Sequence, residues 1–182
     1  MKINTFVAVF FLIAFGTCGT FAQGAKKLQM VFDSAYTNLG KGCQVLKGHG
    51  GTDDASLCEG VGGYRIRIYS SAAATHIVAE RKGSDDSFPI ATVALDFNET
   101  KGKIEWRTAG GKPFAVIYRI DLTKGDSSDA IGMWSKENKT GEHLVIKGLK
   151  GFEHIDFEVD AKTADANVKA RQMADAGYAK KP

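Results

Sequence analysis

Histidine is the residue type in this chain with the widest chemical range, and it occurs at four positions. His49, His76, His143 and His154 are never spaced as His-x-x-x-His or His-x-His, so no local metal chelate is predicted. The sequence also lacks the Gly-x-Ser-x-Gly turn of a serine hydrolase and the glycine-rich loop that cradles phosphate. We therefore expect no cofactor and no metal, and a protein that is not an enzyme.

Cysteine offers a second kind of chemistry. Of three cysteines, Cys18 lies in an apolar leader, which leaves Cys43 and Cys58 as an even pair. Their spacing is not Cys-x-x-Cys, and an exported chain meets an oxidising compartment, so a structural disulfide is predicted. It would close a glycine-rich loop and stabilise the fold by about 3 kcal/mol.

A third candidate is a surface of arginine and tyrosine. Arg65, Arg67 and Tyr69 alternate with Ile66 and Ile68, which places a basic row on one face of a strand and an apolar row on the other. Arginine makes forked hydrogen bonds and tyrosine supplies rigid contact area, so such a face is typical of partner binding.

The same face is expected to continue onto a later hairpin. Glu105, Arg107 and Arg119 fall on the corresponding side of that hairpin in the predicted register. We therefore expect Arg65, Arg67, Tyr69, Arg107 and Arg119 to form one binding face; a solvated outer sheet face is the alternative.

Two glycosylation sequons lie in predicted turns. Asn98-Glu99-Thr100 and Asn138-Lys139-Thr140 would carry sugar if the exporting cell is eukaryotic.

The elements that must position these residues are mainly strands. Alternating apolar residues between turn signals predict strands over 64–69, 75–82, 88–97, 103–108, 112–120, 131–135, 143–147 and 152–159. Short strands joined by glycine turns indicate an antiparallel β-sandwich or a barrel-like meander.

The hairpin between the fourth and fifth of these strands has two possible registers. A three-residue loop over 109–111 would set Ile104 opposite Val116 and Trp106 opposite Phe114, keeping the apolar row on one face. A two-residue Gly110-Gly111 turn would scatter the apolar residues, so the three-residue loop is predicted. Ala115 and Ile117 then make the second strand apolar on both faces, as expected of a central strand.

Two helices complete the predicted fold. Apolar residues recurring at three and four over 26–40 predict an N-terminal helix that ends at Gly40. The run 164–176 has no glycine or proline and carries a stripe of small residues, so it is predicted to be a C-terminal helix packed on the sheet. Residues 170–182 are expected to form a partly flexible tail.

The first 22 residues indicate export. Lys2 precedes an apolar run over 6–15, which is too short to span a bilayer, and Thr20 and Ala22 are small enough for a signal peptidase. We expect cleavage after Ala22, a single β-rich domain over 23–182 and no membrane span in the mature chain. Thr17 departs from the lipoprotein pattern, so no lipid anchor is expected at Cys18.

A secreted or periplasmic, non-catalytic binding protein is the leading functional prediction. The net charge of +3 is spread along the chain, so the expected partner is a macromolecule outside the cell or at its envelope, and not nucleic acid. Size, export and sandwich style are similar to those of small periplasmic lysozyme inhibitors, an analogy of general plan because no inhibitor motif is present. The alternatives are a β-barrel that binds a small apolar ligand, and an exported hydrolase with His143 or His154 as its base.

Overall fold

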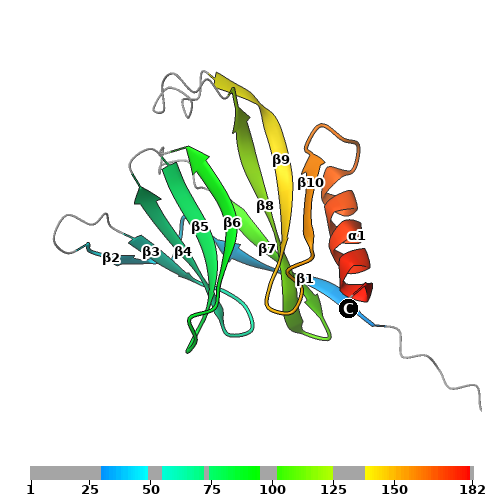
Figure 1. Ribbon diagram of the computed structural model, residues 1–182, viewed down its shortest axis with the longest axis horizontal. Coiled ribbons are helices and arrows are strands. Elements are labelled where there is room, and N and C mark those ends of the chain that lie inside the picture. Colours follow the sequence, from blue (N-terminus) through cyan, green and yellow to red (C-terminus); the bar gives the residue numbers. More distant parts are fainter. Residues whose placement is uncertain (1–29, 49–54, 72–73, 95–101, 125–137, 181–182) are drawn as a thin grey trace, which may run out of the picture.

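The computed structural model describes residues 30–48, 55–71, 74–94, 102–124 and 138–180. These residues form two five-stranded antiparallel sheets and one C-terminal helix (Figure 1). The predicted mainly β, antiparallel fold with a helix packed on a sheet is confirmed.

The chain passes from sheet A to sheet B and later returns to sheet A. Sheet A has the order β1-β7-β8-β9-β10 and contains β1 (Phe32–Asn38), β7 (Lys103–Ala109), β8 (Lys112–Thr123), β9 (Lys139–Gly148) and β10 (Asp156–Asp160). Sheet B is a meander in sequence order and contains β2 (Gln44–Leu46), β3 (Ala55–Glu59), β4 (Tyr64–Ser71), β5 (Ala74–Arg81) and β6 (Ser87–Ala94). The first described strand thus lies in sheet A, the next five strands form sheet B, and the chain returns beside β1 through β7.

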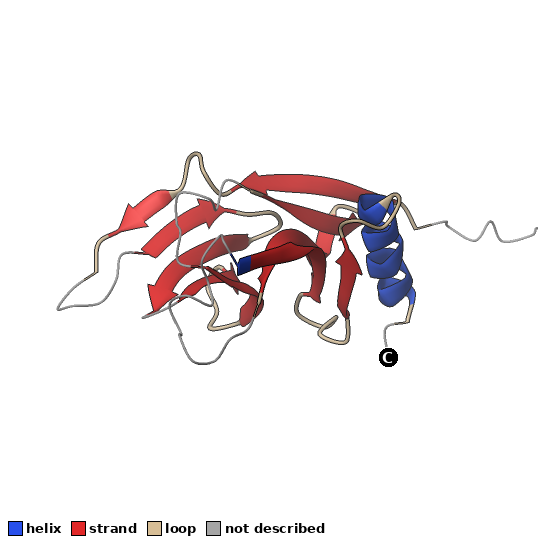
Figure 2. Cartoon of the chain, turned by 90° about the horizontal axis from the view of Figure 1, so that it is seen from above, coloured by secondary structure: helices blue, strands red, loops and turns tan. Residues whose placement is uncertain are grey.

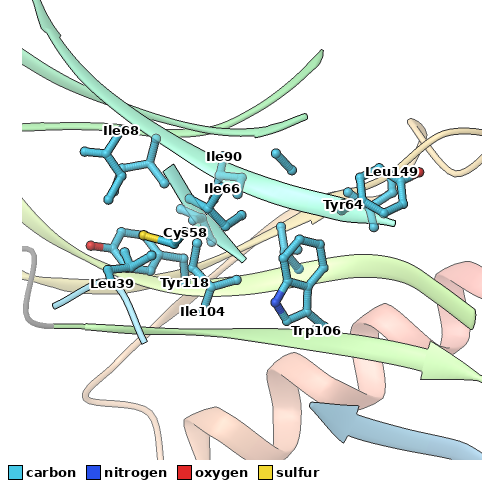
Figure 3. Close-up of a cluster of buried hydrophobic side chains, with 14 residues drawn as sticks. Leu39, Cys58, Tyr64, Ile66, Ile68, Ile90, Ile104, Trp106, Tyr118 and Leu149 are labelled. Atoms are coloured by element: carbon cyan, nitrogen blue, oxygen red, sulfur yellow. The ribbon is translucent and has the colours of Figure 1, made fainter. Parts of the chain in front are cut away.

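The main core lies between the two sheets. Alternation along β4 points Ile66 and Ile68 inward, and they meet Trp106 of β7 and Tyr118 of β8 (Figure 3). Trp106 and Ile66 are completely buried. Inner faces that pack against each other in this way make the arrangement a sandwich.

The helix α1 (Ala166–Ala179) covers the outer face of sheet A. Its buried residues are small and spaced at three and four: Ala166, Ala170, Ala174 and Gly177. They let the helix approach the sheet closely, and a Cβ on Gly177 would lie 2.7 Å from Cγ1 of Ile155. The two views agree that α1 stands on the side of sheet A away from sheet B (Figures 1 and 2). Residues 170–179, expected to begin a flexible tail, belong to this packed helix.

The predicted N-terminal helix over 26–40 is wrong in its described part, where β1 is a strand. One face of β1 meets α1, as Phe32 packs edge to face on Tyr178. The other face meets sheet B, where the Thr37 hydroxyl donates to the Glu59 carbonyl oxygen. Because both faces are covered, apolar residues stand at odd and even positions, and this distribution imitates helical spacing.

The predicted register of the β7–β8 hairpin is also wrong. The turn is the two-residue Gly110-Gly111, with Ala109 opposite Lys112 and φ of 56° and 79° at the two glycines. A β-bulge then shifts the pairing, so that Trp106 lies opposite Val116 and not opposite Phe114. The bulge keeps Val116 in the core between the sheets and turns Phe114 to the helix side. The prediction that this strand is central and covered on both faces is confirmed.

Most other strand predictions hold, with shifted ends. The predicted strand over 152–159 is shorter, because 148–155 form a tight connection before β10. The expected loop between the cysteines contributes β2 and β3 to sheet B. The predicted strand over 131–135, residues 95–97 of another strand, and the leader lie outside the described residues.

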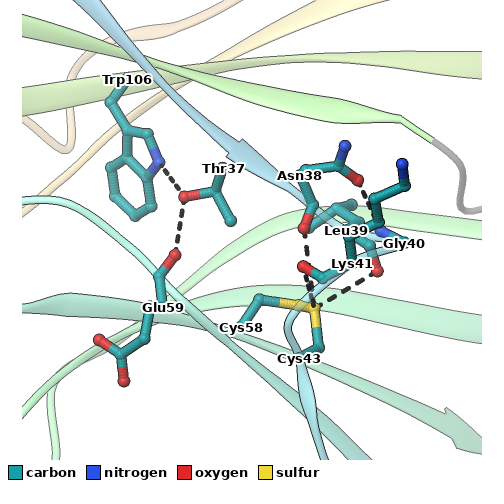
Figure 4. Close-up of a disulfide and its surroundings, with 9 residues drawn as sticks. All are labelled: Thr37, Asn38, Leu39, Gly40, Lys41, Cys43, Cys58, Glu59 and Trp106. Atoms are coloured by element: carbon teal, nitrogen blue, oxygen red, sulfur yellow. Dashed lines mark hydrogen bonds between the residues drawn. A yellow bond between two sulfur atoms is a disulfide. The ribbon is translucent and has the colours of Figure 1, made fainter.

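The disulfide between Cys43 and Cys58 is confirmed (Figure 4). It joins Cys43, which directly precedes β2, to the buried Cys58 of β3. Beside it, the Trp106 indole donates to the Thr37 hydroxyl at 2.9 Å, and Thr37 donates to the Glu59 carbonyl oxygen at 2.9 Å. The two bonds connect β7 and β1 of sheet A to β3 of sheet B and satisfy the buried indole N–H.

Candidate functional site

The outer face of sheet B brings together the first part of the predicted binding surface. Since Ile66 and Ile68 fill the core, Arg65, Arg67 and Tyr69 point to the opposite side of β4. The antiparallel register of β4 and β5 sets Arg65 across from Glu80, Arg67 across from Val78, and Tyr69 across from His76. Cross-strand pairs on one face are close enough for their side chains to interact.

Two arginines share one carboxylate on this face. Arg65 Nε donates to Glu80 Oε2 at 2.9 Å, and Arg67 Nη1 donates to Glu80 Oε1 at 3.4 Å. The Glu80 side chain is 16% exposed, whereas that of Arg67 is 44% exposed. The carboxylate is therefore partly buried against the sheet, and the Arg67 side chain beside it is more exposed to solvent.

An aromatic pair continues the row. The rings of Tyr69 and His76 are stacked at 5.0 Å with an interplanar angle of 26°, and the Arg67 guanidinium carbon lies over the Tyr69 ring at 5.8 Å. His76 Nδ1 is 3.3 Å from the Thr92 hydroxyl of β6. Cation–π and stacking contacts of this kind stiffen side chains that would otherwise sample several rotamers.

A hollow of about 350 Å³ opens among these side chains. Its lining residues come from three adjacent strands and are Arg67, Tyr69, Val78, Glu80 and Ser87. This volume lies at the lower end of the range for ligand sites. The lining offers N–H and O–H donors from Arg67, Tyr69 and Ser87, one carboxylate acceptor, and an apolar surface at Val78. We call this set the sheet B hollow.

The remaining predicted binding residues lie on the other sheet. Arg107 is on the outer face of sheet A, beneath α1, and is only 5% exposed. Its guanidinium donates to both carboxylate oxygens of Asp175 on the helix, with Nη2 to Oδ2 at 2.8 Å. Arg107 therefore attaches the helix to the sheet and is not available to a partner.

Glu105 is buried in the same interface and binds Arg171, the arginine of the helix. Arg171 Nε donates to Glu105 Oε1 at 2.6 Å, and Arg171 Nη2 donates to Oε2 at 3.0 Å. These hydrogen bonds raise the pKa of the Arg171 guanidinium. The Ser34 hydroxyl of β1 donates to Glu105 Oε1 and accepts from Arg107, so β1, β7 and α1 share one polar network.

Arg119 is exposed but distant in the fold from the sheet B hollow. It lies on β8, on the helix side of sheet A, and donates from Nη1 to Glu142 Oε2 at 2.9 Å. The single Arg/Tyr face expected from the sequence is therefore two faces: Arg65, Arg67 and Tyr69 on sheet B, and Arg107 and Arg119 on sheet A. Apolar and polar residues alternate along each of these strands, which correctly predicts that every one of these side chains lies on an outer face. The two outer faces, however, belong to different sheets.

The histidines considered as catalytic bases have structural partners. His143 Nδ1 is 3.1 Å from Glu158 Oε2, and His154 Nε2 is 3.0 Å from the Gly177 carbonyl oxygen. In the described ranges, neither ring is hydrogen-bonded to a hydroxyl or thiol nucleophile. His49 lies outside those ranges.

Of the two sequon asparagines, the structure describes Asn138 and not Asn98. Asn138 is half-buried directly before β9, and its carbonyl oxygen accepts from the Lys124 N–H at 2.9 Å. Asn98 lies outside the described residues.

Four residues of the site were missing from the predicted binding face: His76, Val78, Glu80 and Ser87. Alternation along the predicted strand over 75–82 is enough to put His76 and Glu80 on one face, but it does not show that this face adjoins Arg65 and Arg67. The missing information was the register of the β4–β5 hairpin. In the structure Ser71, at the end of β4, pairs with Ala74, at the start of β5, and this pairing sets the register.

The described residues hold neither a metal-binding cluster nor a membrane-spanning helix. No group of three or more His, Cys, Asp or Glu residues there is arranged to hold a metal ion. The helical segment there is shorter and less apolar than a membrane crossing requires. No protein-family model, no curated protein and no solved structure matches this chain.

Proposed function

We propose that this protein is an exported, non-catalytic binding protein that holds a macromolecular partner on the outer face of sheet B. The observation that carries the proposal is the sheet B hollow, in which arginine, tyrosine and glutamate side chains assemble around an open depression. The corresponding face of sheet A is covered by α1 and its ion pairs.

The composition of the hollow supports binding. Arginine and tyrosine are enriched at the energetic centres of protein interfaces, because both supply contact area together with directed hydrogen bonds. Here Arg67 and Tyr69 support each other and His76 supports Tyr69, so less conformational entropy is lost when a partner binds.

A comparative capture experiment tests the proposal. The immobilised protein is exposed to the extracellular or periplasmic fraction of its source, alongside Arg67→Glu and Arg119→Glu variants. Both arginines are 44% exposed and both pair with one glutamate, so Arg119→Glu controls for charge reversal as such. We expect a component retained by the parent and by Arg119→Glu and lost by Arg67→Glu. Identical retention by all three proteins would contradict binding through sheet B.

Export is the second part of the proposal and has its own test. The leader over 1–22 carries the signal, and the confirmed disulfide is compatible with an oxidising compartment. Mass spectrometry of the natural product is expected to find Gln23 at the amino terminus and Cys43 joined to Cys58. An intact leader would contradict the proposed export.

A further inference from the structure

The charges around the sheet B hollow do not cancel. Arg65 and Arg67 share the carboxylate of Glu80, and Arg65 makes the shorter bond to it, 2.9 Å against 3.4 Å. Glu59 of β3, which the register sets opposite Arg65, is paired with Lys82. Within the described part of the chain, Arg67 makes no other hydrogen bond, so most of its five N–H donors have no partner there. One positive charge is therefore left at the edge of the depression.

The aromatic ring in the hollow is already engaged. His76 stacks on Tyr69 and the Arg67 guanidinium lies over the same ring. A neutral sugar usually needs an open aromatic face, whereas an anion needs donors. Arg67, Tyr69 and Ser87 all line the hollow and all can donate.

We propose that the sheet B hollow binds the carboxylate side chain of an acidic polypeptide. This assignment rests on the proposed function and names the partner's chemistry. The guanidinium of Arg67 takes the carboxylate in a forked, charge-assisted geometry, the Tyr69 and Ser87 hydroxyls donate beside it, and Val78 contacts the methylene groups of the incoming Asp or Glu.

Peptide binding to the disulfide-bonded protein tests the assignment. The probe is a short fluorescein-labelled peptide of alternating Glu and Ser, compared with its Gln/Ser counterpart by fluorescence anisotropy at low salt. We expect the Glu peptide to bind at least about ten-fold more tightly than the Gln peptide, with the difference shrinking as salt screens the charges.

Variants locate the binding. Arg67→Ala is expected to weaken the Glu peptide by about ten-fold or more, and Arg67→Lys, which keeps the charge but loses the fork, by a smaller factor. The matched control Arg119→Ala is expected to stay within about two-fold of the parent, because its arginine is equally exposed but lies on sheet A. Unchanged urea midpoints establish that the variants are folded.

Four outcomes would overturn the assignment. Equal binding of the Glu and Gln peptides would show that the carboxylate is not recognised. Equal binding of the Glu peptide by the parent and Arg67→Ala would show that the peptide does not bind in the hollow. Tighter Arg67-dependent binding of polygalacturonate than of the Glu peptide would point to an acidic polysaccharide. If a natural component is captured through Arg67 while the Glu peptide fails to bind, the proposed function stands and only the carboxylate assignment falls.

Discussion

At the scale of single residues, two arginines in similar strand positions have different roles. Arg107 and Arg119 both stand on outward positions of neighbouring strands. Arg107 is enclosed by α1 and makes a two-pronged bond to Asp175, whereas Arg119 meets Glu142 at the surface. Burial decides the difference, because a charge removed from water depends on its partner far more than a solvated one.

Substituting the buried arginine is expected to destabilise the fold. Arg107→Ala leaves Asp175 and Ser34 without their main donor and should lower the free energy of unfolding by about 2 to 4 kcal/mol. Arg119→Ala, the matched control, should lower it by less than about 1 kcal/mol. Urea unfolding followed by circular dichroism measures both; equal losses would show that the Arg107 network adds nothing beyond a surface pair.

A buried tyrosine, Tyr118, makes the stability of the fold depend on pH in the alkaline range. Burial, with a smaller effect of the Asp121 charge, raises the pKa of Tyr118 from 10.0 to about 12. The unfolded chain therefore releases this proton at lower pH than the folded chain. The stability contributed by Tyr118 is present below pH 10 and is lost as pH rises toward 12.

Spectrophotometric titration checks this prediction. We expect one tyrosine absorbance step near pH 12 that disappears in Tyr118→Phe. That variant should also lose less stability between pH 10 and 12 than the parent. A step that persists in Tyr118→Phe would assign it to another tyrosine.

At the scale of elements, the connection from β9 to β10 is a fixed structure. Gly148 donates to the Ile155 carbonyl oxygen at 2.7 Å, and the Leu149 N–H donates to the Phe114 carbonyl oxygen at 2.8 Å. A Cβ on Gly148 would overlap the carbonyl group of Phe152. This close approach of two backbone segments explains why the end of β9 requires glycine.

Two alanine substitutions in one strand test that requirement. Gly148→Ala is expected to cost about 3 kcal/mol or to prevent folding, because backbone must move to admit the methyl group. Gly141→Ala is the control: it also lies in β9, and nothing stands within 4 Å of the position of its Cβ. It should change stability by no more than about 0.5 kcal/mol in urea unfolding. Similar effects of the two changes would argue against the tight connection.

The β7–β8 hairpin shows how far an element can be predicted. Alternation correctly placed Ile104, Trp106 and Val116 on one face, and central burial of the second strand followed from Ala115 and Ile117. The turn length was wrong because a bulge near Phe114 restores the apolar face that a two-residue turn would otherwise break. A bulge adds one residue without a strong sequence signal, so register could not be settled by periodicity alone.

At the scale of the whole molecule, the disulfide stands where the chain passes from sheet A to sheet B. Cys43 follows β1 closely, and Cys58 lies on the core side of β3 at a sequence separation of 15. Closing this segment limits the freedom of the unfolded chain and holds the short strand β2 to its neighbour.

Loss of the disulfide is expected to destabilise the protein by about 3 kcal/mol. The double variant Cys43→Ala/Cys58→Ala should show this loss in urea unfolding without reductant. The parent in dithiothreitol should show a similar loss, while the double variant should not respond to dithiothreitol. A parent that is equally stable with and without reductant would contradict a stabilising role for the bond.

The sequence determined the features that depend on neighbours along the chain: the strands over 64–69 and 75–82, the C-terminal helix, the outward positions of Arg65, Arg67 and Tyr69, and the choice of cysteines. Tertiary structure decided which segment covers each face. β1 became a strand because sheet B and α1 cover its two sides, and Arg107 became a structural residue because α1 lies over it. Alternation along a strand shows only that a side chain points out of its own sheet. Whether another element covers that side chain depends on contacts between residues more than sixty positions apart, such as Arg107 and Asp175.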